Sequence, residues 1–207
     1  MRKYYLFCFF VISGLVAGAQ VRIGLKAGAH STTAKVVTPG GGKPAVDNNI
    51  GFHAGLAAKM RIEGQLYFVP QLQYAYKTFT IQYNNTDTAT NTLNMHYLEI
   101  PLLFEWKKEN YKSGFFVQFG PSFSLAMSGK QRIEGKSGTS VSKPVKFGFN
   151  AYGRAEANLV ANLGYQFGKR VQLTVGYAHG LGTIVDDDFG PVIKPRMFTG
   201  GLVYWLH

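Results

Sequence analysis

The stretch FFVQFGPSFSL, residues 115–125, alternates apolar and polar side chains with almost no errors. A period of two predicts a β-strand with one apolar and one polar face. In a soluble sheet the apolar face packs on a core, whereas in a membrane barrel it meets lipid and the polar face lines the interior. The rest of the chain must decide between these environments. The apolar side carries Phe115, Val117, Phe119, Phe123 and Leu125, and the polar side carries Gln118, Gly120, Ser122 and Ser124.

The N-terminus predicts export. Arg2 and Lys3 precede an apolar run over residues 4–16, and the small residues AGA follow at 17–19, which is the A-x-A pattern of a secretory cleavage site. A membrane anchor needs about 20 apolar residues, and this run is shorter. We therefore predict a signal peptide over residues 1–19 that is cleaved after Ala19, followed by a single domain over residues 20–207.

Composition excludes several classes of protein. Cys8 lies inside the apolar run, so the mature chain has no cysteine, which excludes a disulfide scaffold, a thiol nucleophile and a cysteine-ligated metal. The net charge of +11 falls to +9 without Arg2 and Lys3. The basic residues do not gather in one arm or helix, and an exported chain does not meet nucleic acid, so no nucleic-acid partner is expected. The 25 glycines and 12 tyrosines suit strands and turns.

The alternation extends over eight segments, and the connections between them alternate in length. Three connections, at 63–65, 107–113 and 168–170, are short, whereas those at 35–49, 83–91, 130–146 and 186–194 are mostly longer. Short turns at one end, longer loops at the other and an even number of strands are typical of an outer-membrane barrel. The predicted strands are 21–34, 50–62, 66–82, 92–106, 114–129, 147–167, 171–185 and 195–206.

The two faces of these segments favour a membrane barrel over a soluble sheet. The second strand sets Phe52, Leu56 and Met60 against His53 and Lys59. Across the strands the polar side mixes a few charges with Gly, Ser, Asn and Gln, as a narrow, crowded interior requires, and the interior of an eight-stranded barrel is just filled by side chains. We therefore predict an all-β protein: an eight-stranded antiparallel transmembrane β-barrel of the up-and-down kind, located in the outer membrane.

Aromatic residues near the short-turn end fit an interfacial girdle. Three prolines oppose a regular barrel, because Pro70, Pro101 and Pro121 fall inside strands and each removes a ladder hydrogen bond. We expect bulges or a locally distorted wall at these positions. The predicted girdle comprises Tyr67, Phe68, Phe104, Trp106, Phe115, Tyr165, Phe167 and Tyr204.

In order along the chain, the segments GFHAGLAAKM, LYFVPQLQYAYKTF, HYLEIPLLFEW, FFVQFGPSFSLAMSGK and VQLTVGYAHGLGTI resemble the PorT-like outer-membrane β-barrel proteins of Bacteroidetes. The most specific piece is YLEIPLL, residues 97–103, where that family also carries Glu and Pro. The resemblance implies an eight-stranded outer-membrane barrel and tolerance of Pro101. It implies no catalytic residue, and the role of one branch in protein secretion and gliding is not transferred. The chain ends in YWLH, whereas many such barrels end in an aromatic residue.

Alternation places nine ionisable residues inside the barrel. They could form an ion pathway, or a plug in which buried charges are paired; eight strands favour the plug. In particular, Glu99 is expected to accept hydrogen bonds from one or more of the basic residues. The nine are Arg22, Lys26, Lys59, Arg61, Lys77, Glu99, Glu105, Arg154 and Glu156.

Histidines suggest a second site. His30, His53 and His179 are predicted at similar height near the outer rim, and the acidic run 186–188 opens the last outer loop. Imidazoles and carboxylates could bind a metal or supply a general base with an orienting acid. The spacing matches no ligand motif and no serine is marked as a nucleophile, so we predict solvated rim polarity, with no metal, no cofactor and no catalytic residue.

The function predicted from these observations is non-enzymatic, with a structural or surface-interaction role. The alternatives are an accessory component of a secretion or transport assembly and, third, a barrel enzyme acting at the rim. The expected partners are outer-membrane lipid and a protein in the outer membrane or at the cell surface. The loop 130–146, with five basic residues and one acidic residue, could contact an anionic surface or an acidic partner.

Overall fold

The computed structural model describes residues 21–206 apart from 84–87, 109–112, 149–150 and 188, and it contains two β-sheets. In this described part, no helix is long and apolar enough to cross a membrane. The predicted signal peptide lies outside the described residues. The strands are β1 (Arg22–Val37), β2 (Ala45–Glu63), β3 (Leu66–Gln82), β4 (Thr88–Lys107), β5 (Gly114–Gly135), β6 (Ser140–Pro144), β7 (Ala151–Tyr152), β8 (Ala155–Phe167), β9 (Val171–Gly180), β10 (Val185–Asp186) and β11 (Val192–Trp205).

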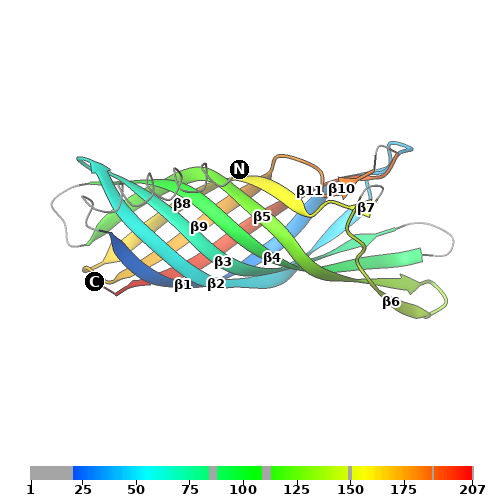
Figure 1. The fold of residues 1–207 in the computed structure, drawn as a ribbon. Coiled ribbons are helices and arrows are strands. Elements are labelled where there is room, and N and C mark those ends of the chain that lie inside the picture. Colours follow the sequence, from blue (N-terminus) through cyan, green and yellow to red (C-terminus); the bar gives the residue numbers. More distant parts are fainter. Residues whose placement is uncertain (1–20, 84–87, 109–112, 149–150, 188, 207) are drawn as a thin grey trace, which may run out of the picture.

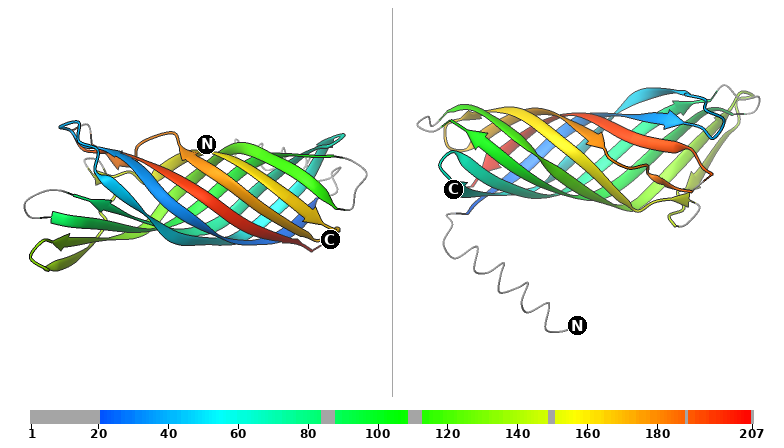
Figure 2. Two further views of the ribbon diagram at one scale, coloured as in Figure 1. Left: turned by 180° about the vertical axis from the view of Figure 1, so that it is seen from behind. Right: turned by 90° about the horizontal axis from the view of Figure 1, so that it is seen from above.

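Eight of these strands close into a ring. The order β4–β3–β2–β1–β11–β9–β8–β5 is completed by pairing of β4 with β5, and every pair in the ring is antiparallel. The strands cross the ring obliquely, as Figures 1 and 2 show, which is the tilt that barrel closure requires. Each ring strand pairs with its neighbours along the chain, so the prediction of an up-and-down, eight-stranded antiparallel barrel is confirmed for the described residues.

Several strand boundaries were predicted wrongly, mostly at the long-loop end. The predicted loops 35–49 and 130–146 are largely strand, because the backbone in them continues to pair with neighbouring strands. β5 runs on to Gly135 and pairs with β6 in a projecting hairpin, which lies at the right of Figure 1. Conversely, the predicted strand 147–167 begins only at Ala155, and the predicted strand 171–185 ends at Gly180.

The faces of the strands were assigned correctly. On β5, Phe115 is 68% exposed on the outside of the ring, whereas Ser122 is 4% exposed inside it. Large apolar side chains on the other ring strands show the same outward exposure. The phenylalanines of the stretch 115–125 therefore form the outer surface, where an outer-membrane barrel meets lipid.

The predicted girdle is present with one correction. Phe115 packs edge to face on Tyr165 at 4.9 Å between ring centroids, and Phe68 lies 5.4 Å from Phe104. Tyr67 instead points inward: its ring centroid lies 4.5 Å from the ammonium group of the buried Lys59. An aromatic at a strand end can serve either face, and only the register decides which.

The prolines interrupt pairing without shifting it. On β4, Pro101 pairs with Ser122 and the next recorded pair is Phe104 with Phe119, in unchanged register. The bulges of the described ladders lie elsewhere, for example between His96 and Tyr97. Of the two accommodations expected, the described ladders show no bulge at the prolines, and the gaps in pairing fit a locally distorted wall. A few missing ladder bonds are tolerated because the neighbouring pairs hold the register.

The outer half of the interior is apolar, which the prediction of a polar lumen missed. Inward-facing side chains there form a buried cluster, and residues from the outer connections close it from above. The alternation keeps its sense along β4: Met95 and Glu99 both point inward, and only the character of the inward side chains changes, from apolar above to charged below. The cluster comprises Ala34, Val36, Ala75, Phe79, Ile81, Leu93, Met95, Tyr97, Ala126, Val145, Ile184 and Ile193.

Candidate functional site

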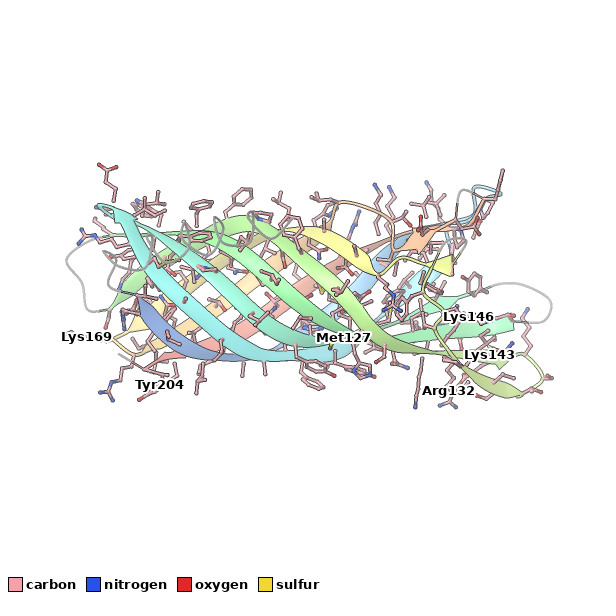
Figure 3. The ribbon with its side chains drawn as sticks, in the orientation of Figure 1. Met127, Arg132, Lys143, Lys146, Lys169 and Tyr204 are labelled. Atoms are coloured by element: carbon pink, nitrogen blue, oxygen red, sulfur yellow. The ribbon has the colours of Figure 1, made fainter. Side chains whose placement is uncertain are left out.

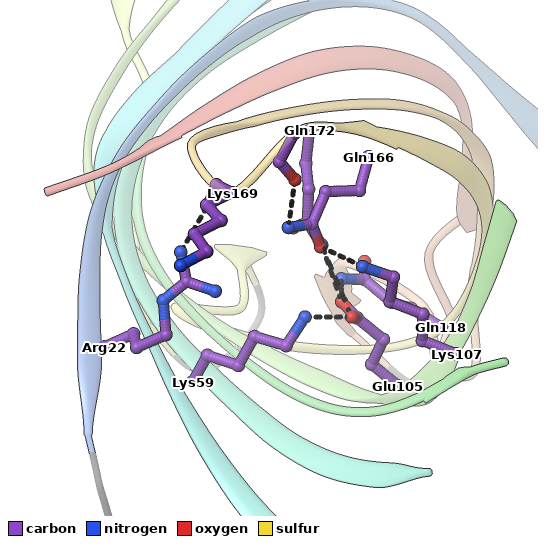
Figure 4. A network of polar contacts seen from close by, with 9 residues as sticks. Arg22, Lys59, Glu105, Lys107, Gln118, Gln166, Lys169 and Gln172 are labelled. Atoms are coloured by element: carbon purple, nitrogen blue, oxygen red, sulfur yellow. Dashed lines mark hydrogen bonds and ion pairs between the residues drawn. The ribbon is translucent and has the colours of Figure 1, made fainter. Parts of the chain in front are cut away.

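The floor of the barrel, near the short turns, is a polar network built around Glu105. Lys59 donates a hydrogen bond to Glu105 Oε1, and Gln118 Nε2 donates to Oε2 at 2.8 Å. Gln172 Nε2 contacts the same carboxylate at 3.3 Å and also donates to Gln166 Oε1 at 3.1 Å. Figure 4 shows these side chains converging from opposite walls. Five strands are thereby tied together across the interior.

Aromatic rings hold the floor in place. The Lys59 ammonium lies 4.5 Å from the Tyr67 ring centroid and 5.7 Å from that of Trp205, and Arg22 lies 5.6 Å from the Trp205 centroid. Trp205 is completely buried and packs with Val69. Cation–π contacts of this kind are stronger where water is excluded, so the buried lysine is stabilised by both the carboxylate and the rings.

A second ionic layer crosses the middle of the barrel. Lys77 Nζ lies 2.7 Å from Glu99 Oε1 and 2.8 Å from Glu156 Oε1. Gln73 Nε2 donates to Glu99 at 2.7 Å, and Ser124 Oγ donates at 3.1 Å. The expectation that Glu99 accepts from a basic residue is therefore met by Lys77. Buried charges are tolerated only when paired and hydrogen-bonded, and this layer satisfies that condition.

The two buried histidines lie in the barrel interior and contact each other. His30 Nε2 lies 3.1 Å from the carbonyl oxygen of Tyr76, so it must carry the donating hydrogen. Neutral His30 then presents Nδ1 as an acceptor, 3.4 Å from Nδ1 of His53. This leaves His53 Nε2 as a buried acceptor that has no partner among the described residues.

His53 Nε2 faces a small polar cavity. The cavity has a volume of about 40 Å³, which is the space of roughly one water molecule. Lys26 lies at its wall and donates to Gln71 Oε1 at 2.6 Å. The polar residues that line it are Lys26, His30, His53, Gln71, Gln73, Glu99, Ser122, Asn158, Asn162, Thr174 and Thr199.

Six of the nine predicted lumen charges lie inside the barrel, and three lie elsewhere. The buried or half-buried interior holds three lysines and three glutamates, which balance. Arg22 stands at the short-turn mouth and donates to the carbonyl oxygen of Lys169. Arg61 is exposed at the same mouth, where its Nε donates to Gly64 O at 3.0 Å. Arg154 is exposed at the other end, 5.2 Å from the Phe147 ring centroid. All three arginines lie at or near strand ends, where a long side chain reaches a mouth of the barrel. Alternation alone does not predict this position.

The predicted rim cluster of histidines is not formed. His179 lies on the outward face of β9, 3.2 Å from the Tyr177 hydroxyl, and therefore does not join His30 and His53. The last two lie below the apolar cluster and are 4% and 5% exposed. Of the acidic run, Asp188 lies outside the described residues. Within the described chain, no three His, Cys, Asp or Glu residues come together as a metal site would require.

The outer closure was missed because its members come from loops. Val145 and Ile184 are buried against the interior cluster, and Phe147 and Tyr152 pack beside them. β7 and β10, which carry the latter part of this closure, pair with each other through Tyr152 and Val185. Burial raises the pKa of Tyr152 to about 12. The alternation of β4 held a usable signal, since its outer part places Leu93 and Met95 on the same side as Glu99.

Comparison with known proteins points to one family. The model of the outer membrane protein beta-barrel domain matches residues 17–186. No curated protein matches the chain. Among solved structures, Ail, the attachment invasion locus protein of Yersinia pestis, is 12% identical over 90% of this chain and 99% of its own, with a TM-score of 0.48. Neisserial surface protein A is 13% identical over 87% of this chain and 96% of its own, with a TM-score of 0.45.

Proposed function

This chain belongs to the outer membrane protein beta-barrel domain family, and from that premise we propose that it is a closed, non-catalytic barrel whose role is structural or is exercised at the cell surface. It is an outer-membrane β-barrel protein. The proposal includes removal of the signal peptide after Ala19, which leaves the barrel domain over residues 20–207.

The observation that carries this proposal is the closure of the interior at successive levels. The Lys59–Glu105 network occupies the floor, the Lys77–Glu99–Glu156 layer the middle, and the apolar cluster the outer half. A hydrated ion would have to separate buried ion pairs and then cross an apolar plug, and each step exposes charge to a medium of low dielectric constant. The interior therefore suits stability rather than transport.

The outer end offers the surface on which a partner would act. Lys130, Lys143 and Lys146 are exposed on and beside the β5–β6 hairpin, and Arg132 pairs with Glu134 at 3.0 Å. Figure 3 shows Arg132, Lys143 and Lys146 at this end, beyond Met127. β6 is a short edge strand that carries Lys143 and Pro144, features that discourage pairing with another strand. A basic hairpin favours an anionic surface or an acidic partner.

Two narrower functions stand beside this one. The resemblance of residues 97–103 to PorT-like barrels supports an accessory role in a secretion or transport assembly. Co-purification from gently solubilised membranes separates that role from a purely structural one, because an assembly component brings the same partners at fixed ratio. An enzyme at the rim is not favoured, since His30 and His53 are buried and His179 points outward.

Planar-bilayer recording tests the closed interior. We expect the purified barrel to show no steady conductance. The floor variant K59S/E105S is expected to remain silent as well, because the outer apolar cluster lies in series with the floor. A large, stable current from the unmodified barrel would contradict the proposal. Deleting the hairpin turn 136–139 tests the surface role. The deletion should abolish co-purification of a surface partner and leave the barrel folded.

A further inference from the structure

A second hollow lies at the short-turn mouth, on the far side of the Lys59–Glu105 floor from the histidine cavity. It has a volume of about 240 Å³, which is the space of roughly eight water molecules. Five ring strands contribute to its wall. The lining residues are Arg22, Lys59, Arg61, Tyr67, Lys107 and Gln166.

Among the described residues that line this mouth pocket, every charged side chain is basic. Its four ionisable side chains other than Tyr67 are two arginines and two lysines, and Lys108, Lys169 and Arg170 lie in or beside the adjoining turns. Lys59 is matched by Glu105, whereas Lys107 donates to the neutral amide oxygen of Gln166 at 2.9 Å. Cations that converge on one concave site attract anions and raise their local concentration.

The donors of the pocket are held in place before any ligand arrives. The Arg22 guanidinium lies over the Trp205 ring and donates to the Lys169 carbonyl, and Lys107 is fixed by Gln166. Figure 4 shows Arg22 and Lys59 entering the mouth from one wall and Lys107 from the other. Donors fixed in this way lose little conformational entropy when a ligand binds.

A buried N–H group beside the pocket, that of the Trp205 indole, also lacks an acceptor in the described part of the chain. Trp205 Nε1 is buried and has no hydrogen-bond partner among the described residues. Trp205 lies directly beneath Arg22 and Lys59. A buried N–H group without an acceptor is costly, and native structures usually satisfy it with a water molecule or a ligand.

We propose that the mouth pocket binds a phosphate group, with Arg22 and Lys107 as the principal donors. A phosphate offers several acceptor oxygens and suits the planar fork of arginine together with the point charge of lysine. The group comes either from a soluble oxyanion in the periplasm or from the headgroup of an anionic lipid in the inner leaflet. Because the pocket lies outside the floor network, binding there does not require an open lumen and does not depend on the proposed function.

The test uses the whole barrel in phosphatidylcholine nanodiscs and inorganic pyrophosphate as the probe. We expect saturable binding by calorimetry, a change in tryptophan emission, and weaker binding as salt rises. The variant R22Q/K107Q should weaken binding at least about tenfold, since each substitution removes a charge-assisted hydrogen bond. The control K130Q/K143Q removes the same net charge at the opposite end and should bind as the parent does.

Nanodiscs that contain phosphatidylglycerol distinguish the two sources. If lipid headgroups occupy the pocket, pyrophosphate binding is weaker in these nanodiscs, and the tryptophan emission without pyrophosphate already resembles that of the bound state. If the ligand is soluble, the two kinds of nanodisc give the same affinity. Absence of pyrophosphate binding in phosphatidylcholine nanodiscs, or equal affinity for R22Q/K107Q and the control, would overturn the proposal. Far-UV circular dichroism confirms that each variant is folded.

Discussion

Lys77 and Glu99 meet inside the barrel, with Nζ 2.7 Å from Oε1, and this contact joins β3 to β4 from the lumen side. Alternation along each strand placed both residues inside but left six cations as candidate partners for Glu99. The ring selects Lys77, and it adds Glu156 from β8 as a second carboxylate on the same ammonium at 2.8 Å. One lysine therefore holds two walls of the barrel together.

Replacing members of this layer should destabilise the barrel unequally. Glu99→Leu leaves Lys77 with Glu156, so we expect a loss of unfolding free energy near the lower end of the about 3–5 kcal/mol typical of breaking a buried pair. Lys77→Met leaves two buried carboxylates without their cation, so the loss of unfolding free energy should be larger. Denaturant titration in micelles measures both. A neutral Glu99→Leu, or the reverse order of the two variants, would contradict this account of the layer.

Leu102 tests the assignment of the outward face. Its side chain lies on the outer surface of β4, between the levels of His96 and Trp106. Leu102→Arg should cost roughly 2–4 kcal/mol because the charge faces the bilayer interior. Leu102→Met, which keeps an apolar side chain of similar volume, should cost less than about 1.5 kcal/mol. Tolerance of arginine in the same titration would mean that the two faces have been exchanged.

Gly120 tests the weakened ladder near the prolines. A Cβ atom at this position would lie 2.1 Å from the carbonyl oxygen of Leu102, which is backbone and cannot move aside cheaply. Gly120→Ala should therefore cost about 1–3 kcal/mol, as overpacking usually does. Gly200→Ala is the matched control, because a Cβ there meets no atom within 4 Å. Equal midpoints for thermal unfolding of the two variants would refute the close approach of β4 and β5.

Cleavage after Ala19 remains a prediction from the sequence. Mass analysis of the protein recovered from outer membranes should give an N-terminus at Gln20. Ala19→Arg should block processing, because the A-x-A site requires small residues. A mature chain that retains Met1, or recovery of the protein in the soluble fraction, would refute the signal peptide.

The alternation of side chains predicted much of the candidate site, and the residues that it misplaced show the limits of such a prediction. Inward placement was correct for Lys59, Lys77, Glu99 and Glu105, because each lies well inside a ring strand where the side-chain period is fixed. Inward placement was wrong for Arg154, because this residue lies just before β8, where strand pairing does not fix the direction of its side chain. The position of a residue along the barrel axis was less predictable than whether its side chain faces inward or outward. The two buried histidines were placed at the rim because the length of strand above them was underestimated.

The sequence by itself determined the ring: the number of strands, their antiparallel order, the face of each strand that meets lipid and the end that carries the short turns. These features follow from local periodicity and turn length, which do not depend on distant residues. Only the tertiary structure decided which buried charges are partners, that loop residues such as Val145 and Ile184 close the outer half, and that cations from three strands share one mouth. Strand tilt and register set those contacts, because they bring together residues far apart in the chain.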